Sequence, residues 1–122
     1  MIGRVSFTTI DAVDPDQLAA FWCEVLGTEV EETSDEGRFV FLGEANGYVL
    51  SFQRVPEPKS VKNRMHLDIV TPDIHREAAR LEALGARQVA REERSEHGST
   101  WVLMEDPEGN EFCICDGGTG GA

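Results

Sequence analysis

Basic residues are scarce in this sequence of 122 residues. The 11 Lys and Arg residues are outnumbered by 23 Asp and Glu residues, which gives a formal net charge of −12 at pH 7. A protein that binds nucleic acid needs a basic patch to neutralise phosphate groups, so this balance argues against a nucleic-acid partner. The acidic excess instead suits a cationic ligand, or serves only solubility.

One short segment departs from this acidic composition. Both lysines of the chain, Lys59 and Lys62, lie in it, and Arg54 and Arg64 flank them. Two interpretations stay open: a solvated linker, or a basic spot that meets an anionic group of a ligand.

Long apolar runs are also missing. No segment approaches the roughly 20 apolar residues needed to cross a bilayer. The N-terminus lacks the basic-then-apolar pattern of a signal peptide. We therefore expect a soluble, cytoplasmic protein without a membrane partner.

Cysteine is too rare for a disulfide framework. Of the three cysteines, Cys113 and Cys115 are two residues apart on an apparent strand. Alternation then places them on one face about 6.5 Å apart, which suits a bridge poorly. We interpret the cysteines as reduced thiols that pack in the core, with metal binding as the alternative.

What the sequence does contain is an internal repeat. Two predicted helices end in Leu-Gly, at 26–27 and 84–85, so Leu84 follows Leu26 by 58 residues. The length suits one globular domain rather than two independent ones. We therefore predict a single domain built from two similar modules, whose equivalent positions face each other around a pseudo-twofold axis.

The same offset pairs residues that suit a binding site. It carries Thr8 onto His66, and Gln53 onto Glu111. Imidazole and carboxylate groups are metal-ligand types, so His66 and Glu111 are the stronger candidates.

Hydrophobic periodicity and turn residues predict the same βαβββ order in both halves. The first module spans 4–55, with strands at 4–12, 28–33, 38–43 and 48–55 and a helix from Asp14 to Gly27. The second spans 64–116, with strands at 64–70, 87–93, 100–105 and 110–116 and a helix at 73–84. A linker, 56–63, joins them, 92–99 contains a loop, and the Gly-rich tail at 117–122 is expected to be flexible.

Strand alternation decides which side chains share a face. In the first strand we take Val5 and Phe7 as the apolar face, and in the fifth strand Met65, Leu67 and Ile69. If these faces lie under the helices, the opposite, concave side receives four residues. They are Thr8, Gln53, His66 and Glu111.

Several motifs together resemble the vicinal oxygen chelate superfamily. They are Asp-Pro at 14–15, Phe-Trp at 21–22, His-Leu-Asp at 66–68 and the closing Asp-Pro-Glu-Gly-Asn-Glu-Phe at 106–112. The superfamily includes glyoxalase I, extradiol dioxygenases, methylmalonyl-CoA epimerase and the fosfomycin and bleomycin resistance proteins, and the small glyoxalase-like branch is the most similar. The resemblance implies an α+β domain over 1–116 with a cupped, eight-stranded mixed sheet.

The resemblance also implies a metal site. Its ligands correspond to Thr8, Gln53, His66 and Glu111, and its metal is a divalent Zn, Ni, Mn or Fe ion that holds two neighbouring substrate oxygens. Thr8 stands where an extradiol dioxygenase needs a second His. Because the amide of Gln53 cannot act as a base, a glyoxalase mechanism depends on Glu111 as the catalytic carboxylate.

Two functions follow as expectations. The first is a metal-dependent lyase or isomerase acting on a small molecule with vicinal oxygens. The alternative is a non-enzymatic protein that sequesters an antibiotic, as bleomycin resistance proteins do, and a ligand-sensing module is a third. A site without metal stays open, with His66 held by Asp68 and Glu111 completing the turn after Asn110. By resemblance we expect a homodimer, with modules paired within or between chains.

Overall fold

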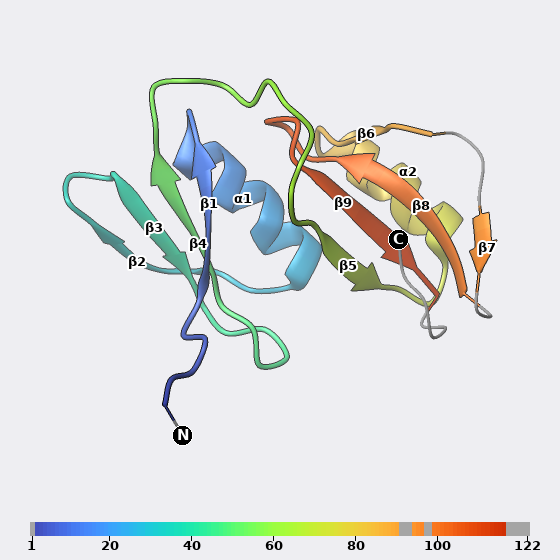
Figure 1. Ribbon diagram of the computed structural model, residues 1–122, viewed down its shortest axis with the longest axis horizontal. Coiled ribbons are helices and arrows are strands. Elements are labelled where there is room, and N and C mark those ends of the chain that lie inside the picture. The colour runs from blue at the N-terminus through green and yellow to red at the C-terminus, as the bar shows by residue number, and fades with distance from the viewer. Residues whose placement is uncertain (1, 91–93, 97–98, 117–122) are drawn as a thin grey trace. The chain divides into compact units, whose positions relative to one another are not determined.

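The computed structural model describes residues 2–90, 94–96 and 99–116. The chain divides into two compact units, Met1–Pro58 and Lys59–Ala122. Each unit contains a strand, then a helix, then further strands (Figure 1). The predicted α+β class with two tandem βαβββ modules is confirmed. The predicted flexible tail at 117–122 lies outside the described residues.

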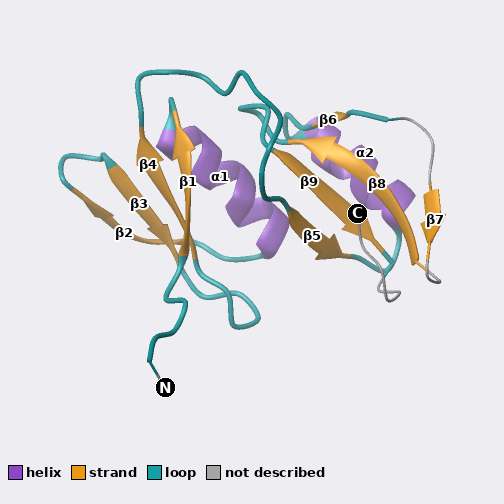
Figure 2. Ribbon diagram, in the orientation of Figure 1, coloured by secondary structure: helices purple, strands orange, loops and turns teal. Residues whose placement is uncertain are grey.

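The first unit is a four-stranded mixed sheet with a helix on one face (Figure 2). Strand β1 pairs in parallel with β4, and β4, β3 and β2 follow as antiparallel neighbours. The elements in chain order are β1 (Thr8–Ala12), α1 (Pro15–Leu26), β2 (Val30–Ser34), β3 (Phe39–Leu42) and β4 (Leu50–Arg54).

Helix α1 has the predicted ends. The Asp14 side chain accepts a hydrogen bond from the Gln17 backbone N–H at 3.1 Å, and Pro15 occupies the first helical position. Gly27 ends the helix at φ 69°, in the left-handed region that favours glycine. The core between α1 and the sheet is filled by side chains that are almost wholly buried: Leu18, Phe21, Trp22, Val40 and Phe52.

The second unit is a mixed sheet with α2 on one face. Its strands lie in the order β5-β9-β8-β6, with β5 parallel to β9 and β7 paired to β8. The elements in chain order are β5 (Leu67–Val70), α2 (Ile74–Ala83), β6 (Arg87–Gln88), β7 (Arg94–Glu96), β8 (Ser99–Glu105) and β9 (Glu111–Cys115). Its core is formed by Ile74, Ala78, Leu81, Met104, Phe112 and Ile114.

Several strand boundaries differ from the prediction. Strand β1 begins at Thr8, opposite Leu50, the first residue of β4, so residues 4–7 precede the ladder. Strand β5 begins at Leu67 instead of 64. Strand β6 ends at Gln88, and β7 forms inside the segment predicted as a loop, so the described strands number nine rather than eight.

Two predictions from composition can be compared with the fold. The three cysteines are free thiols, as predicted. Within the described part of the chain, no helix combines the length and the apolar character needed to span a membrane.

Candidate functional site

The first unit contains two of the predicted site residues, Thr8 and Gln53, on opposite faces of its sheet. Thr8 lies opposite the buried Leu50 and shares its face with Ile10 and Ala12, under α1. Gln53 lies opposite Asp11 and points the other way. The expectation that Thr8 and Gln53 share a concave face is therefore wrong.

The error came from Val5 and Phe7, which were expected to pack under the helix. Both are exposed, and the Phe7 ring makes an edge-on contact with Phe41 at 5.3 Å between centroids. Phe41 neighbours the buried Val40 on β3 and so belongs to the face opposite α1. Phe7 thus lies on the side of the sheet opposite α1.

The second unit brings His66 and Glu111 to one face of its sheet. In the parallel ladder Leu67 lies opposite Phe112, and Asp68 opposite Cys113. Because Phe112 is packed in the core with α2, alternation sends Asp68, Glu111 and Cys113 to the other face. We call this the site face.

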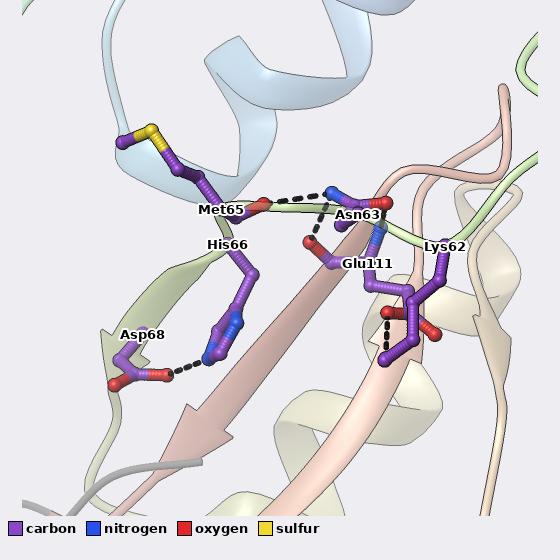
Figure 3. Close-up of polar contacts among 6 residues, drawn as sticks. All are labelled: Lys62, Asn63, Met65, His66, Asp68 and Glu111. Atoms are coloured by element: carbon purple, nitrogen blue, oxygen red, sulfur yellow. Dashed lines mark hydrogen bonds and ion pairs between the residues drawn. The ribbon is translucent and has the colours of Figure 1, made fainter.

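His66 immediately precedes β5, and its ring points toward Asp68 (Figure 3). The His66 Nε2 and Asp68 Oδ1 atoms are 3.3 Å apart, and about two fifths of each side chain is exposed. This is the contact expected if Asp68 orients the imidazole. The neighbouring Met65 side chain extends the opposite way and is largely exposed, so the prediction that Met65 belongs to a buried apolar face is wrong.

Glu111, the first residue of β9, is held from the segment that precedes β5. The Lys62 ammonium forms an ion pair with the Glu111 carboxylate, whose side chain is only 11% exposed. The Asn63 side chain accepts a hydrogen bond from the Glu111 N–H at 3.1 Å and donates to the Met65 carbonyl at 3.0 Å (Figure 3). Asn63 therefore joins the chain beside His66 to the start of β9.

The turn before Glu111 is organised by Asp106, which is almost wholly buried. Its Oδ1 accepts hydrogen bonds from the Glu108 N–H at 2.9 Å and the Asn110 N–H at 3.0 Å. The Asn110 side-chain amide also donates to both carboxylate oxygens. Gly109, at φ 84°, takes the left-handed position of the turn. The turn carboxylate is thus Asp106, which leaves Glu111 on the sheet.

Cys113 also belongs to this site, although the sequence analysis favoured core packing for the cysteines and kept metal binding only as the alternative. One ligand atom each from His66, Asp68 and Cys113 lies within 4.8 Å of the other two. Burial, then the nearby negative charge of Asp68, raises the pKa of the Cys113 thiol to about 12. The Cys113 side chain is therefore a neutral thiol at pH 7.

These side chains fit a divalent metal ion in their chemistry. An imidazole nitrogen, a carboxylate oxygen and a sulfur form a donor set that Zn(II) and related transition metals accept. These three donors would bind the ion from the side of the sheet. Because His66 and Asp68 are partly exposed, a coordination position toward solvent would stay free.

The chain is similar to known proteins in both sequence and fold. A family model described as a glyoxalase-like domain matches residues 7–115. Curated protein sequences, by contrast, give no match.

The similar solved structures share the fold at low identity. A mutant of the fosfomycin resistance protein FosX from Listeria monocytogenes, in complex with Mn(II) and 1S,2S-dihydroxypropylphosphonic acid, is 18% identical, with TM-score 0.78 over 98% of this chain and 93% of that one. A glyoxalase/bleomycin resistance protein/dioxygenase family enzyme from Burkholderia phytofirmans is 20% identical, with TM-score 0.73 over 90% and 95% of the two chains. A glyoxalase-related enzyme from Fulvimarina pelagi is 21% identical, with TM-score 0.72 over 93% and 88%.

Proposed function

The chain belongs to the glyoxalase-like domain family, and from this premise we propose that it binds a small molecule beside a divalent metal ion on the site face. The proposed reaction is of the lyase or isomerase type, on a substrate with two vicinal oxygens. The observation that carries the proposal is the convergence of His66, Asp68 and Cys113 within 4.8 Å.

Each residue of the site has a proposed role. His66 and neighbouring ligands on the site face would hold the ion, which when bound supplies a Lewis acid to two neighbouring substrate oxygens. Glu111, next to this group along β9, is the proposed carboxylate that moves a proton at the substrate carbon. The Lys62 ammonium forms an ion pair with that carboxylate and so places a positive charge beside it.

The proposed site is built from the second unit alone, so Gln53 of the first unit is not among its ligands. Thr8, which lies on the helix-covered face of its sheet, is left out. The FosX complex contains Mn(II) together with a compound whose name places hydroxyl groups on neighbouring carbons, and this supports a vicinal-oxygen substrate.

Metal titration tests this proposal directly. Calorimetry of the metal-free protein with Zn(II), Ni(II), Mn(II) and Fe(II) is expected to give saturable binding of one ion per chain for at least one metal. A positive result would justify a screen of lyase and isomerase substrates with vicinal oxygens in the presence of that metal. Absence of saturable binding for all four metals would contradict the proposal.

A second candidate function is sequestration of a cationic, partly apolar molecule. In the first unit a hollow of about 220 Å³ is lined by three acidic and three apolar side chains. They are Glu31, Glu32, Glu44, Phe41, Leu42 and Val49. Carboxylates and apolar side chains in one hollow complement a partly apolar cation, and the net charge of −12 would attract it.

This alternative predicts binding that depends on the charge of the hollow. A planar cationic dye is expected to bind with a fluorescence change, whereas an uncharged dye of similar shape is not. Glu32→Gln should weaken binding by up to about fivefold, because an exposed ion pair contributes up to about 1 kcal/mol. Glu57→Gln, an exposed carboxylate outside the hollow, is the control. Equal binding of both dyes would argue against the sequestration function.

A further inference from the structure

We propose that Cys113 is a thiolate ligand of the metal ion, and that the site therefore selects a thiophilic ion such as Zn(II) over Mn(II). This inference rests on the proposed metal-dependent function and goes beyond it, because it names the group that sets the identity of the metal. The evidence lies in the second unit alone.

The sheet register places the three donors together. Cys113 lies directly opposite Asp68 in the parallel ladder, and His66 is two residues before Asp68 on the same side. Backbone hydrogen bonds fix which residues are paired in a ladder, so the pairing of β5 with β9 itself places the Cys113 sulfur beside the Asp68 carboxylate. Only the imidazole and the carboxylate need to reorient around an ion.

The distances suit a small coordination sphere. Ligands of a four-coordinate Zn(II) ion lie about 2.0–2.3 Å from it and therefore about 3.3–3.8 Å from one another. The three ligand atoms already lie within 4.8 Å of one another. The His66 and Asp68 side chains are partly exposed, so rotation of each can close the remaining gap of about 1 Å.

The three donors differ in how far they are buried, and this difference would leave one side of a bound ion open to solvent. Cys113 is wholly buried, whereas His66 and Asp68 reach solvent. An ion held by all three would have its thiolate on the sheet side and an open position toward solvent, as catalytic zinc sites have. The open position is where a substrate oxygen or a water molecule would bind.

The charges of the donors also suit a divalent metal ion. When sulfur binds the ion, the S–H bond breaks, the S–metal bond forms and one proton passes to the buffer. A thiolate and the Asp68 carboxylate together offset the charge of a divalent ion.

Hard and soft ligand preferences then set the metal. Thiolate ligands favour Zn(II) and Co(II), whereas Mn(II) and Mg(II) prefer carboxylate, carbonyl and water oxygens. A site of carboxylates and imidazole alone, such as one that paired His66 with Glu111, would also bind Zn(II) more tightly than Mn(II), but by a smaller margin.

Cobalt spectroscopy of the full chain tests the thiolate. The metal-free protein is loaded with Co(II), whose bond to a thiolate produces charge-transfer absorption in the near ultraviolet. We expect this absorption in the unmodified protein and its loss in Cys113→Ser. Zn(II) affinity by calorimetry should fall at least about tenfold in that variant, while Mn(II) stays the weaker ion in the unmodified protein.

Cys115 provides the matched control. It is a buried thiol on the same strand and the same side as Cys113, but it lies opposite Val70 instead of Asp68. Cys115→Ser should retain the charge-transfer absorption. If Cys113→Ser fails to fold, charge-transfer absorption that persists in both Cys115→Ser and Cys23→Ser assigns the bond to Cys113, the one cysteine that neither change removes.

The outcomes separate the two proposals. Calorimetric binding of Co(II) without charge-transfer absorption would overturn the role of Cys113 and leave the metal-dependent function standing. Absence of metal binding altogether would overturn both. Absorption that persists in Cys113→Ser would also overturn the assignment.

Discussion

His66→Ala is expected to lower the affinity of the protein for a divalent metal ion by at least about tenfold. Even the partners that only orient a metal ligand are worth about 10- to 100-fold in affinity, and His66 is proposed as a direct ligand. The imidazole is also the one nitrogen donor of the converging group. Calorimetric titration of the metal-free variant, beside the unmodified protein, measures the change.

Two variants make this prediction specific. His75→Ala removes an exposed imidazole on α2 and should leave metal affinity unchanged. Glu111→Gln keeps the size of the side chain but removes its charge, so it should reduce turnover more than metal affinity if Glu111 moves the proton. A His66→Ala protein that is folded and binds metal with unchanged affinity would contradict the metal site itself.

The sequence predicted the modules because their signals are local. The Asp14 cap and the Gly27 stop each depend on a few neighbouring residues, and the structure reproduces both. Strand alternation also placed His66 and Glu111 on one face, since alternation within β5 and β9 is a property of each strand.

The failures arose where one strand had to be registered against another. Nothing local shows that Cys113 lies opposite Asp68, because that pairing joins segments far apart in the chain. The same limit applies to Thr8, whose face follows from its pairing with Leu50. Phe7 misled the prediction because an apolar residue before a strand was assumed to face the helix, whereas it contacts Phe41.

The turn before β9 shows how local chemistry positions a site residue without taking part in it. The Asp-Pro-Glu-Gly-Asn motif was a specific signal in the sequence, and its Asp106 carboxylate gathers the turn's donors. That turn fixes where β9 starts, and so it fixes the position of Glu111, the first residue of the strand, on the site face. The turn motif at 106–110 therefore shapes the backbone, whereas Glu111, which follows it directly, supplies the chemical group.

Asp106→Ala is expected to destabilise the protein by about 2–3 kcal/mol. The carboxylate is 4% exposed and accepts the backbone N–H groups of Glu108 and Asn110. Removing it leaves two donors without this acceptor, and each buried unsatisfied donor costs about 1–3 kcal/mol before water makes up part of the loss. Urea unfolding followed by circular dichroism gives the free energy of unfolding.

The size of the loss should follow the number of acceptor atoms removed. Asp106→Asn keeps the Oδ1 acceptor for both backbone donors but places an NH₂ group against the Asn110 amide, so about half of the loss is expected. Glu57→Ala, an exposed carboxylate in the linker, should change the stability by no more than about 0.5 kcal/mol. If Asp106→Ala were as mild as Glu57→Ala, the turn would not depend on its buried carboxylate. The position of Glu111 would then have to be set mainly by Asn63, through its hydrogen bonds to the start of β9.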